Sequence, residues 1–189
     1  MSSPRKTLDD VLGDAQKWGT LGRRSISEVI SHARQFVAPL ASCIGPVIDI
    51  GTGAGVPGLV IAVDRLDLRL VLTDRRATRM DALRRGVMAM GLADRVEVVT
   101  ADVEDLGRDP EHAAQYEAVV SRGFGPPEAT LRLAIPLVTP GGMIVISEPP
   151  SDQPDRWKKT ELLDALGVTL IRDFPGVAVF RVSTPSTLG

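Results

Sequence analysis

Glycines are concentrated in one short stretch of the chain. The stretch VIDIGTGAGVPG covers residues 47–58 and contains four glycines within eight positions: Gly51, Gly53, Gly55 and Gly58. Asp49 stands two positions before the first of them. Glycine lets another group approach the main chain closely and adopts backbone angles that strain other residues. The stretch therefore predicts a binding loop whose ligand lies close to the main chain.

The spacing in this loop favours a cationic ligand over a pyrophosphate. In the dinucleotide-binding fingerprint G-x-G-x-x-G, the third glycine would fall at Val56. A pyrophosphate binds bare N–H groups at a helix N-terminus, and the Asp49 carboxylate would repel it. An ammonium or sulfonium group would instead be attracted. S-adenosylmethionine (SAM) carries both cations, so the loop favours SAM over NAD and disfavours an NAD-linked oxidoreductase.

Two further acids follow the next two strand-like segments. Asp74 ends the segment LVLTD, where a carboxylate can accept hydrogen bonds from both hydroxyls of a ribose. Asp102 follows the segment VVT and could accept from an adenine amino group, while Val103 could cover the ring. Either acid could instead cap the helix or turn that follows it. With Asp49, these residues predict a nucleoside site along one end of a sheet.

Short apolar strands alternate with helices after residue 46. This alternation predicts the fold that positions the three acids. The pattern indicates a doubly wound, mostly parallel α/β sheet of seven strands, with helices on both faces and a closing hairpin that adds an antiparallel edge. The strands are expected at 47–50, 68–74, 95–100, 117–121, 142–147, 168–174 and 176–182, and the helices at 56–63, 80–90, 128–138 and 155–166. Ligands of such sheets bind at the carboxyl ends of the strands, where the glycine loop lies.

Two helices are predicted before the first strand. Apolar residues recur at helical spacing after Thr7, and Ser25 with Glu28 forms a capping box before an apolar face that continues to Leu40. We therefore expect one domain over residues 1–189, with a helical N-terminal extension at 1–44 and a SAM-binding core at 45–189.

The amino-acid composition limits the classes of protein to which this chain can belong. Apolar residues make up 43% and charged residues 24% of the chain, the formal net charge is −2, and the pI is about 5.7. These values predict a globular cytoplasmic protein without a global positive field. The single cysteine, Cys43, excludes an internal disulfide, and His32 and His112 lie too far apart in sequence for helical metal-ligand spacing. No apolar run approaches membrane-spanning length, so no membrane partner and no metal are expected.

The segments DIGTGAGVPGLVIAV, at 49–63, and VVSRGF, at 119–124, resemble the GidB family of class I SAM-dependent methyltransferases. Members of this family methylate guanine N7 in small-subunit ribosomal RNA. The resemblance implies SAM as cofactor, ribosomal RNA or the small ribosomal subunit as partner, and Arg122 as the catalytic candidate. Arg122 could hold either the methionine carboxylate or the acceptor. The cofactor-binding set is expected to be Asp49, Gly51, Thr52, Gly53, Gly55, Gly58, Asp74, Arg75, Asp102, Val103 and Arg122.

The residue types agree with N7 as the acceptor. Guanine N7 has a free lone pair and no proton to remove, so its methylation needs no general base. A nucleophilic cysteine, which methylation of cytosine C5 requires, is not expected, because Cys43 precedes the first strand and is interpreted as structural. RNA phosphates could be contacted by Arg23, Arg24 and the arginines between residues 75 and 85, although such a cluster is also typical of a solvated helix face.

One segment departs from the family pattern and keeps two alternatives open. The family usually ends its fifth strand with a Lys-Gly pair, whereas this chain has SEPP at 147–150. Together with the acidic pI, this segment favours a methyltransferase that acts on a small molecule as the first alternative. The second alternative is a SAM-binding protein that does not catalyse.

Overall fold

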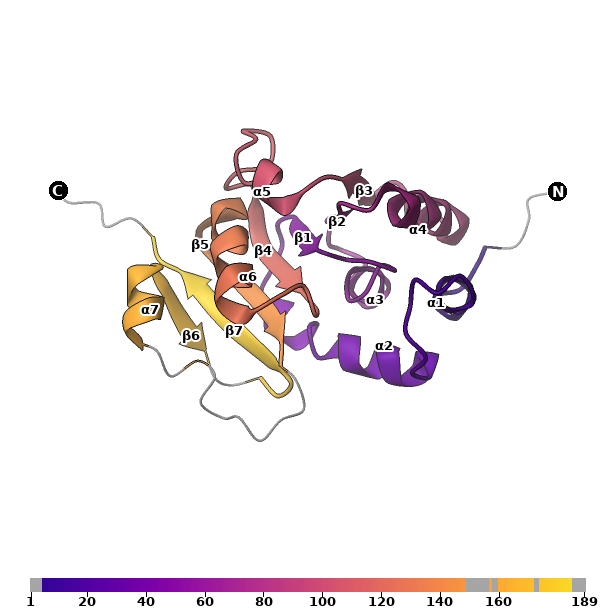
Figure 1. The fold of residues 1–189 in the computed structure, drawn as a ribbon, viewed down its shortest axis with the longest axis horizontal. Helices are drawn as coiled ribbons and strands as arrows, with labels where there is room; N and C mark the ends of the chain where they lie inside the picture. The colour runs from indigo at the N-terminus through magenta and orange to yellow at the C-terminus, as the bar shows by residue number, and fades with distance from the viewer. Residues whose placement is uncertain (1–4, 149–156, 158–159, 172–173, 185–189) are drawn as a thin grey trace.

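The computed structural model describes residues 5–148, 157, 160–171 and 174–184, and its centre is a sheet of seven strands. The strands are β1 (Val47–Ile50), β2 (Leu70–Asp74), β3 (Val96–Thr100), β4 (Tyr116–Ser121), β5 (Val138–Ser147), β6 (Val168–Ile171) and β7 (Val177–Val182). They lie in the order β3-β2-β1-β4-β5-β7-β6, and β1 to β5 are parallel. The predicted doubly wound, mostly parallel sheet is therefore confirmed (Figure 1).

The closing hairpin differs from the prediction in one respect. Strands β6 and β7 pair antiparallel as expected, but β7 also pairs antiparallel with β5. The single antiparallel strand is thus inside the sheet, and the edge strand β6 runs in the same direction as β1 to β5. Either strand of a hairpin can pair with the neighbouring strand of the sheet. The sequence pattern does not show whether β6 or β7 pairs with β5.

Helices cover both faces of the sheet. They are α1 (Leu8–Lys17), α2 (Ile26–Arg34), α3 (Gly58–Asp64), α4 (Ala77–Met90), α5 (Val103–Leu106), α6 (Pro127–Ala134) and α7 (Thr160–Ala165), with short 3-10 helices η1 (Ala38–Leu40) and η2 (Ile135–Leu137). Alternate residues of each strand point to opposite faces. Val47 accordingly packs with α1 to α4, whereas Ile48 and Ile50 pack with α5, α6 and α7. Figure 1 shows α1 and α4 beside each other, far from α7 and β6.

Prolines end two of the predicted helices early. The helix expected to continue to Leu40 stops at Arg34, and the chain then turns into η1 around Pro39. The helix expected over 128–138 stops at Ala134, and η2 contains Pro136. Proline lacks the N–H group for helix propagation, and its ring collides with the carbonyl four residues earlier.

The N-terminal helices belong to the same core as the sheet. Thr7 caps α1 and Ser25 caps α2, each in a capping box with the residue three positions later. Their buried side chains lie in one apolar cluster with α3, α4 and one face of the sheet. This packing holds α1 against α4 on the side of the glycine loop. None of the helices in the described ranges is long and apolar enough to cross a membrane.

Candidate functional site

A cleft lies at the carboxyl ends of the central parallel strands. Four neighbouring strands, β3, β2, β1 and β4, end there, and the loops after them form its walls. Its volume is about 390 Å³. The residues that line it are Gly51, Asp74, Arg75, Arg76, Arg79, Ala101, Asp102, Val103, Gly123, Phe124 and Leu133. The cleft occupies the position at which open α/β sheets bind ligands.

The glycines after β1 divide into two pairs with different surroundings. Gly51 and Gly53 have φ angles of 66° and 58°, and they lie at the surface of the loop. A Cβ on Gly53 would come no closer than 3.7 Å to another group. Gly55 and Gly58 are buried, and a Cβ on Gly58 would come within 2.1 Å of Leu72. Only the first pair can therefore meet a ligand, whereas the second allows the loop and α3 to pack closely.

Asp49 lies beneath this loop, fully buried. One carboxylate oxygen, Oδ2, accepts hydrogen bonds from the Thr52 hydroxyl at 2.6 Å and from the Gly58 main-chain N–H at 2.8 Å. The other oxygen, Oδ1, has no hydrogen-bond partner within the described ranges. Asp49 thus connects the end of β1 to both the loop and the start of α3. Neither Asp49 nor Thr52, which is also buried, is among the residues that line the cleft.

Burial sets the charge state of Asp49. Loss of hydration raises its pKa to about 7, although the hydrogen bonds from Thr52 and Gly58 and the positive charge of Arg122 oppose that shift. Arg122 follows β4 and is partly buried, and loss of hydration lowers the pKa of its guanidinium. Its side chain makes no hydrogen bond or ion pair with any described residue. Arg122 itself does not line the cleft, but the next two residues do.

Asp74 and Asp102 both line the cleft, as the sequence predicted, and both also bind the main chain that follows them. Asp74 accepts a hydrogen bond from the Arg76 N–H at 3.0 Å, and Asp102 caps α5 by accepting from the Glu104 N–H at 3.0 Å. In each case one oxygen makes this bond, and the second has no partner among the described residues. The capping role and a ligand role are therefore compatible.

Cations surround the acids of the cleft. Arg75, Arg76 and Arg79 line it, and none of their side chains forms an ion pair or hydrogen bond within the described ranges. The sequence predicts Arg75 as a cofactor-binding residue, whereas it predicts Arg79 only as part of a basic cluster that could contact RNA phosphates. Arg76 is the N-cap residue of α4 and Arg79 lies in its first turn, so a spacing of three positions brings both to the start of this helix, just after Asp74. That spacing is the signal that could have identified Arg79.

Phe124 covers part of the glycine loop. A Cβ on Gly51 would lie 2.3 Å from the Cδ2 atom of Phe124, so the ring packs directly against the glycine. The side chain is 36% exposed and lines the cleft. The phenylalanine is thus placed to contact a planar group in the cleft, a role that its sequence context alone does not distinguish from packing.

Cysteine chemistry is not available at this site. Cys43 is buried before β1, and burial raises the pKa of its thiol to about 12. A thiol with so high a pKa is a poor nucleophile. Among the described residues, no group of three or more histidine, cysteine or acidic side chains could hold a metal ion.

Comparison with known proteins agrees with the predicted family. Residues 14–165 match the GidB family, described as rRNA small subunit methyltransferase G. The chain is 30% identical over 121 residues to Ribosomal RNA small subunit methyltransferase G of Moorella thermoacetica, covering 64% of this chain and 50% of that protein. It is 31% identical over 142 residues to the same-named protein of Dictyoglomus thermophilum, covering 71% and 58%. The chain therefore spans about half the length of the curated relatives it matches.

The fold also resembles a solved structure. A candidate SAM-dependent methyltransferase of Methanococcus maripaludis superposes with a TM-score of 0.64 at 17% identity, and the alignment covers 100% of both chains. At this level of identity the likeness shows a shared fold. The family match includes the glycine loop, the cleft and Arg122, all of which lie within residues 14–165. The chain belongs to the GidB family of small-subunit ribosomal RNA methyltransferases.

Proposed function

We propose that this chain transfers a methyl group from SAM to guanine N7 in the RNA of the small ribosomal subunit. The observation that carries the proposal is the family match over residues 14–165, because this span contains every residue that lines the cleft. The chemistry of the cleft supports it independently. The proposal has two parts, the cofactor and the acceptor, and each part has its own supporting observations.

The residues of the cleft fit SAM. Gly51 lines the cleft beside Phe124, Gly53 leaves the main chain open on the same loop, and Asp74 has a carboxylate oxygen without a partner among the described residues for the ribose hydroxyls. Asp102 and Val103 line the same cleft and can meet the adenine, and Arg75 is also part of the lining. When bound, SAM supplies an electrophilic methyl group on a sulfonium.

The amino-acid end of the cofactor has matching charges in this chain. Arg122 is a partly buried cation without an ion-pair partner in the described ranges, and it can neutralise a carboxylate. Asp49 has one oxygen without a partner in the described ranges, and above its pKa of about 7 its negative charge favours an ammonium or sulfonium across the loop. Because Asp49 is fully buried, its influence on the cofactor acts through the loop that it holds and through its field. Thr52, Gly55 and Gly58 support the same loop from inside.

The cleft suits an acceptor that needs no base. No histidine or cysteine occurs among the described residues that line it, and both acids are bonded to main-chain N–H groups. A lone pair such as that of guanine N7 would accept the methyl group that SAM supplies, the sulfonium would leave as a neutral thioether, and no proton would have to be removed. The chain then contributes orientation and exclusion of water. Phe124 can hold the guanine by stacking.

Methyl transfer to isolated ribosomal particles tests this proposal. Small subunits from a strain that lacks the gene are incubated with the protein and SAM labelled in the methyl group, and the modified nucleoside is identified by mass spectrometry. We expect labelled N7-methylguanine at a single position of the RNA. The absence of transfer by a protein that binds SAM would overturn the RNA proposal, and label on another atom would overturn the N7 assignment.

The acidic pI of 5.7 supports a second candidate, a methyltransferase with a small-molecule acceptor. The SEPP segment was the other argument for it, and Pro149 and Pro150 of that segment lie outside the described residues. The two candidates differ in their response to salt, because a polyanion releases counterions when it binds. Catalytic efficiency that is independent of salt concentration would favour the small molecule.

A further inference from the structure

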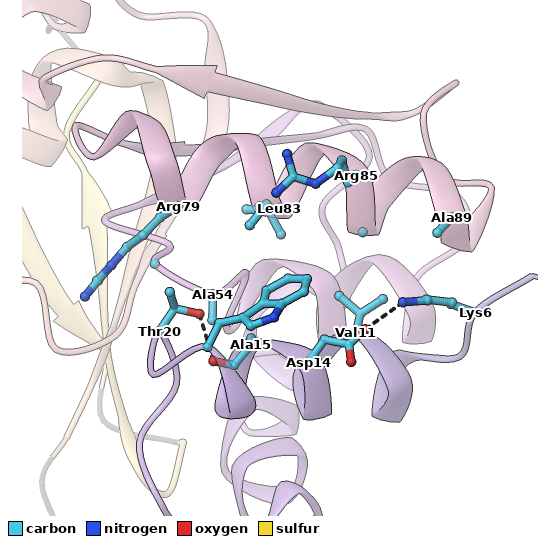
Figure 2. Close-up of a pocket in the computed structure, with 14 residues that line it drawn as sticks. Lys6, Val11, Asp14, Ala15, Thr20, Ala54, Arg79, Leu83, Arg85 and Ala89 are labelled. Atoms are coloured by element: carbon cyan, nitrogen blue, oxygen red, sulfur yellow. Dashed lines mark hydrogen bonds and ion pairs between the residues drawn. The ribbon is translucent and has the colours of Figure 1, made fainter.

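A second cavity lies between α1 and α4, next to the cleft but separate from it (Figure 2). Its volume is about 220 Å³. We refer to it as the α1–α4 groove. Its lining comprises Lys6, Val11, Asp14, Ala15, Trp18, Thr20, Gly53, Ala54, Arg79, Ala82, Leu83, Arg85, Gly86 and Ala89. Arg79 lines both cavities, and Gly53 of the groove is two residues from Gly51 of the cleft. The groove and the glycine loop therefore share Gly53 and Ala54.

Small residues give the groove its shape. Ala82, Gly86 and Ala89 come from α4, and Ala15 and Ala54 face them from α1 and the glycine loop. The two helices touch at Gly86, where a Cβ would lie only 2.7 Å from Val11. This contact fixes the distance between α1 and α4. The groove beside it therefore results from the packing of the two helices. Such a narrow apolar space fits a flat ring.

Trp18 supplies an aromatic wall for this space. It follows the last residue of α1, lines the groove and remains 61% exposed. By contrast, the other tryptophan of the chain, Trp157, is 8% exposed and packs edge-on against Phe180. An exposed indole beside small residues is a stacking surface for a planar ligand.

The charges of the groove select an anionic ligand. Lys6 is neutralised by Asp14 at 2.6 Å, as Figure 2 shows. Arg79 and Arg85 have no ion-pair partner within the described ranges, and Figure 2 shows both on α4 beside the groove. They lie six positions apart, which corresponds to about 9 Å along the helix axis. The groove thus combines one flat aromatic surface with two unpaired cations at separate points.

We propose that the α1–α4 groove binds a nucleotide of single-stranded RNA that neighbours the methylated base. Trp18 stacks on the base, and Arg79 and Arg85 contact the phosphates on either side. This inference rests on the proposed RNA substrate and assigns a second contact to it, outside the cleft. Aromatic stacking combined with arginine contacts to the backbone is the general means by which proteins hold single strands.

Binding of a short RNA measures the groove directly. The probe is a fluorescein-labelled single-stranded oligoribonucleotide of mixed sequence, and its anisotropy is followed with the full chain at several salt concentrations. Trp18→Ala is expected to weaken binding roughly ten-fold, whereas Trp18→Phe keeps a stacking ring and most of the affinity. Arg85→Ala is expected to lower the slope of log K against log salt by about one unit.

Arg84 provides the matched control for Arg85. It precedes Arg85 on α4, but it is bonded to Asp81 at 2.9 Å and to the Val98 carbonyl at 3.0 Å, and it does not line the groove. Arg84→Ala should leave the salt slope unchanged. SAM affinity, measured by calorimetry, should be the same in all four variants, which also shows that each is folded.

The outcomes separate this inference from the proposed function. If the wild-type chain methylates small subunits but Trp18→Ala and Arg85→Ala bind the RNA probe as well as wild type, the groove inference alone is overturned. If the variants lose activity on intact subunits while they bind and methylate deproteinised RNA normally, the groove contacts a ribosomal protein, which also overturns it. Failure of the wild-type chain to methylate RNA at all removes the proposed function itself.

Discussion

Asp49 is a buried carboxylate whose ionisation affects the stability of the fold. Its pKa is about 7 in the folded protein, against an ordinary value of 3.8. Between these two pH values the folded state holds a proton that the unfolded chain has already lost. The free energy of unfolding therefore receives a contribution from Asp49 that decreases as pH rises from about 4 to about 7 and then becomes constant.

Asp49→Asn tests this linkage. The amide oxygen can still accept from the Gly58 N–H, and the side chain no longer ionises. Urea unfolding of both proteins at several pH values between 5 and 8 gives the difference in free energy of unfolding. We expect the variant to gain stability relative to wild type as pH rises to about 7. A difference that does not change with pH would show that Asp49 does not titrate in this range.

We expect Asp74 to affect cofactor binding more directly, because it lines the cleft. Asp74→Ala removes the acceptor for two ribose hydroxyls and is expected to weaken SAM binding by about 2 kcal/mol. Asp81→Ala is the matched control, since Asp81 lies on α4 and pairs with Arg84 outside the cleft. Calorimetry with SAM and with NADH measures both affinities. Binding of NADH, or equal SAM affinity in the two variants, would contradict the assignment.

The glycine loop is the element in which binding and folding can be separated. Gly53→Ala adds a methyl group whose nearest side-chain atom is Arg79 Nη1 at 3.7 Å, so it causes no clash, and its cost is backbone strain of about 1–2 kcal/mol at positive φ and obstruction of the ligand. Gly58→Ala forces a methyl group against Leu72 and should destabilise the fold by about 1–3 kcal/mol. Thermal unfolding and SAM calorimetry on both variants distinguish these effects.

We expect Gly53→Ala to lose most SAM affinity while it still unfolds cooperatively. Gly58→Ala should show the larger decrease in stability of the two. Equal losses of stability and binding in both variants would mean that Gly53, like Gly58, serves packing alone.

The sequence predicts the elements of this fold better than their contacts. Apolar runs such as residues 68–74 and 95–100 identify the strands, and the positions of Asp74 and Asp102 at or just after the ends of these two runs locate both acids at the cleft. The pattern does not reveal the depth of Asp49, because a residue at a strand end can point into the ligand site or beneath the loop. It also does not reveal the α1–α4 groove, which depends on the contact between Gly86 and Val11 across 75 residues of chain.

At the scale of the whole molecule, a net charge of −2 means that the proposed RNA binding requires a local cluster of arginines. Arg23 and Arg24 are exposed before α2, and Arg24 is close enough to Arg122 to influence its pKa. Arg23→Glu with Arg24→Glu should therefore impair methylation of small-subunit RNA several-fold and reduce its salt dependence, while SAM affinity stays unchanged.

A control with the same change in net charge uses other arginines. Arg108 forms ion pairs with acids of α5. Arg181 of β7 donates a hydrogen bond to the main-chain carbonyl of Gly141 in β5. Neither lines the cleft or the groove. Arg108→Glu with Arg181→Glu should leave methylation nearly unchanged. Similar losses in both double variants would show that overall charge, and not this surface, controls the reaction.

The internal position of β7 affects how the molecule is made. Translation produces β6 before β7, yet within the described sheet β6 pairs only with β7, and β7 alone joins it to β5. During synthesis β5 is therefore an open edge with unpaired main-chain groups until β7 leaves the ribosome, a period in which it can pair with another nascent chain. After folding, the amide protons of β6 should never exchange with solvent more slowly than those of β7, because β6 cannot stay in the sheet without it.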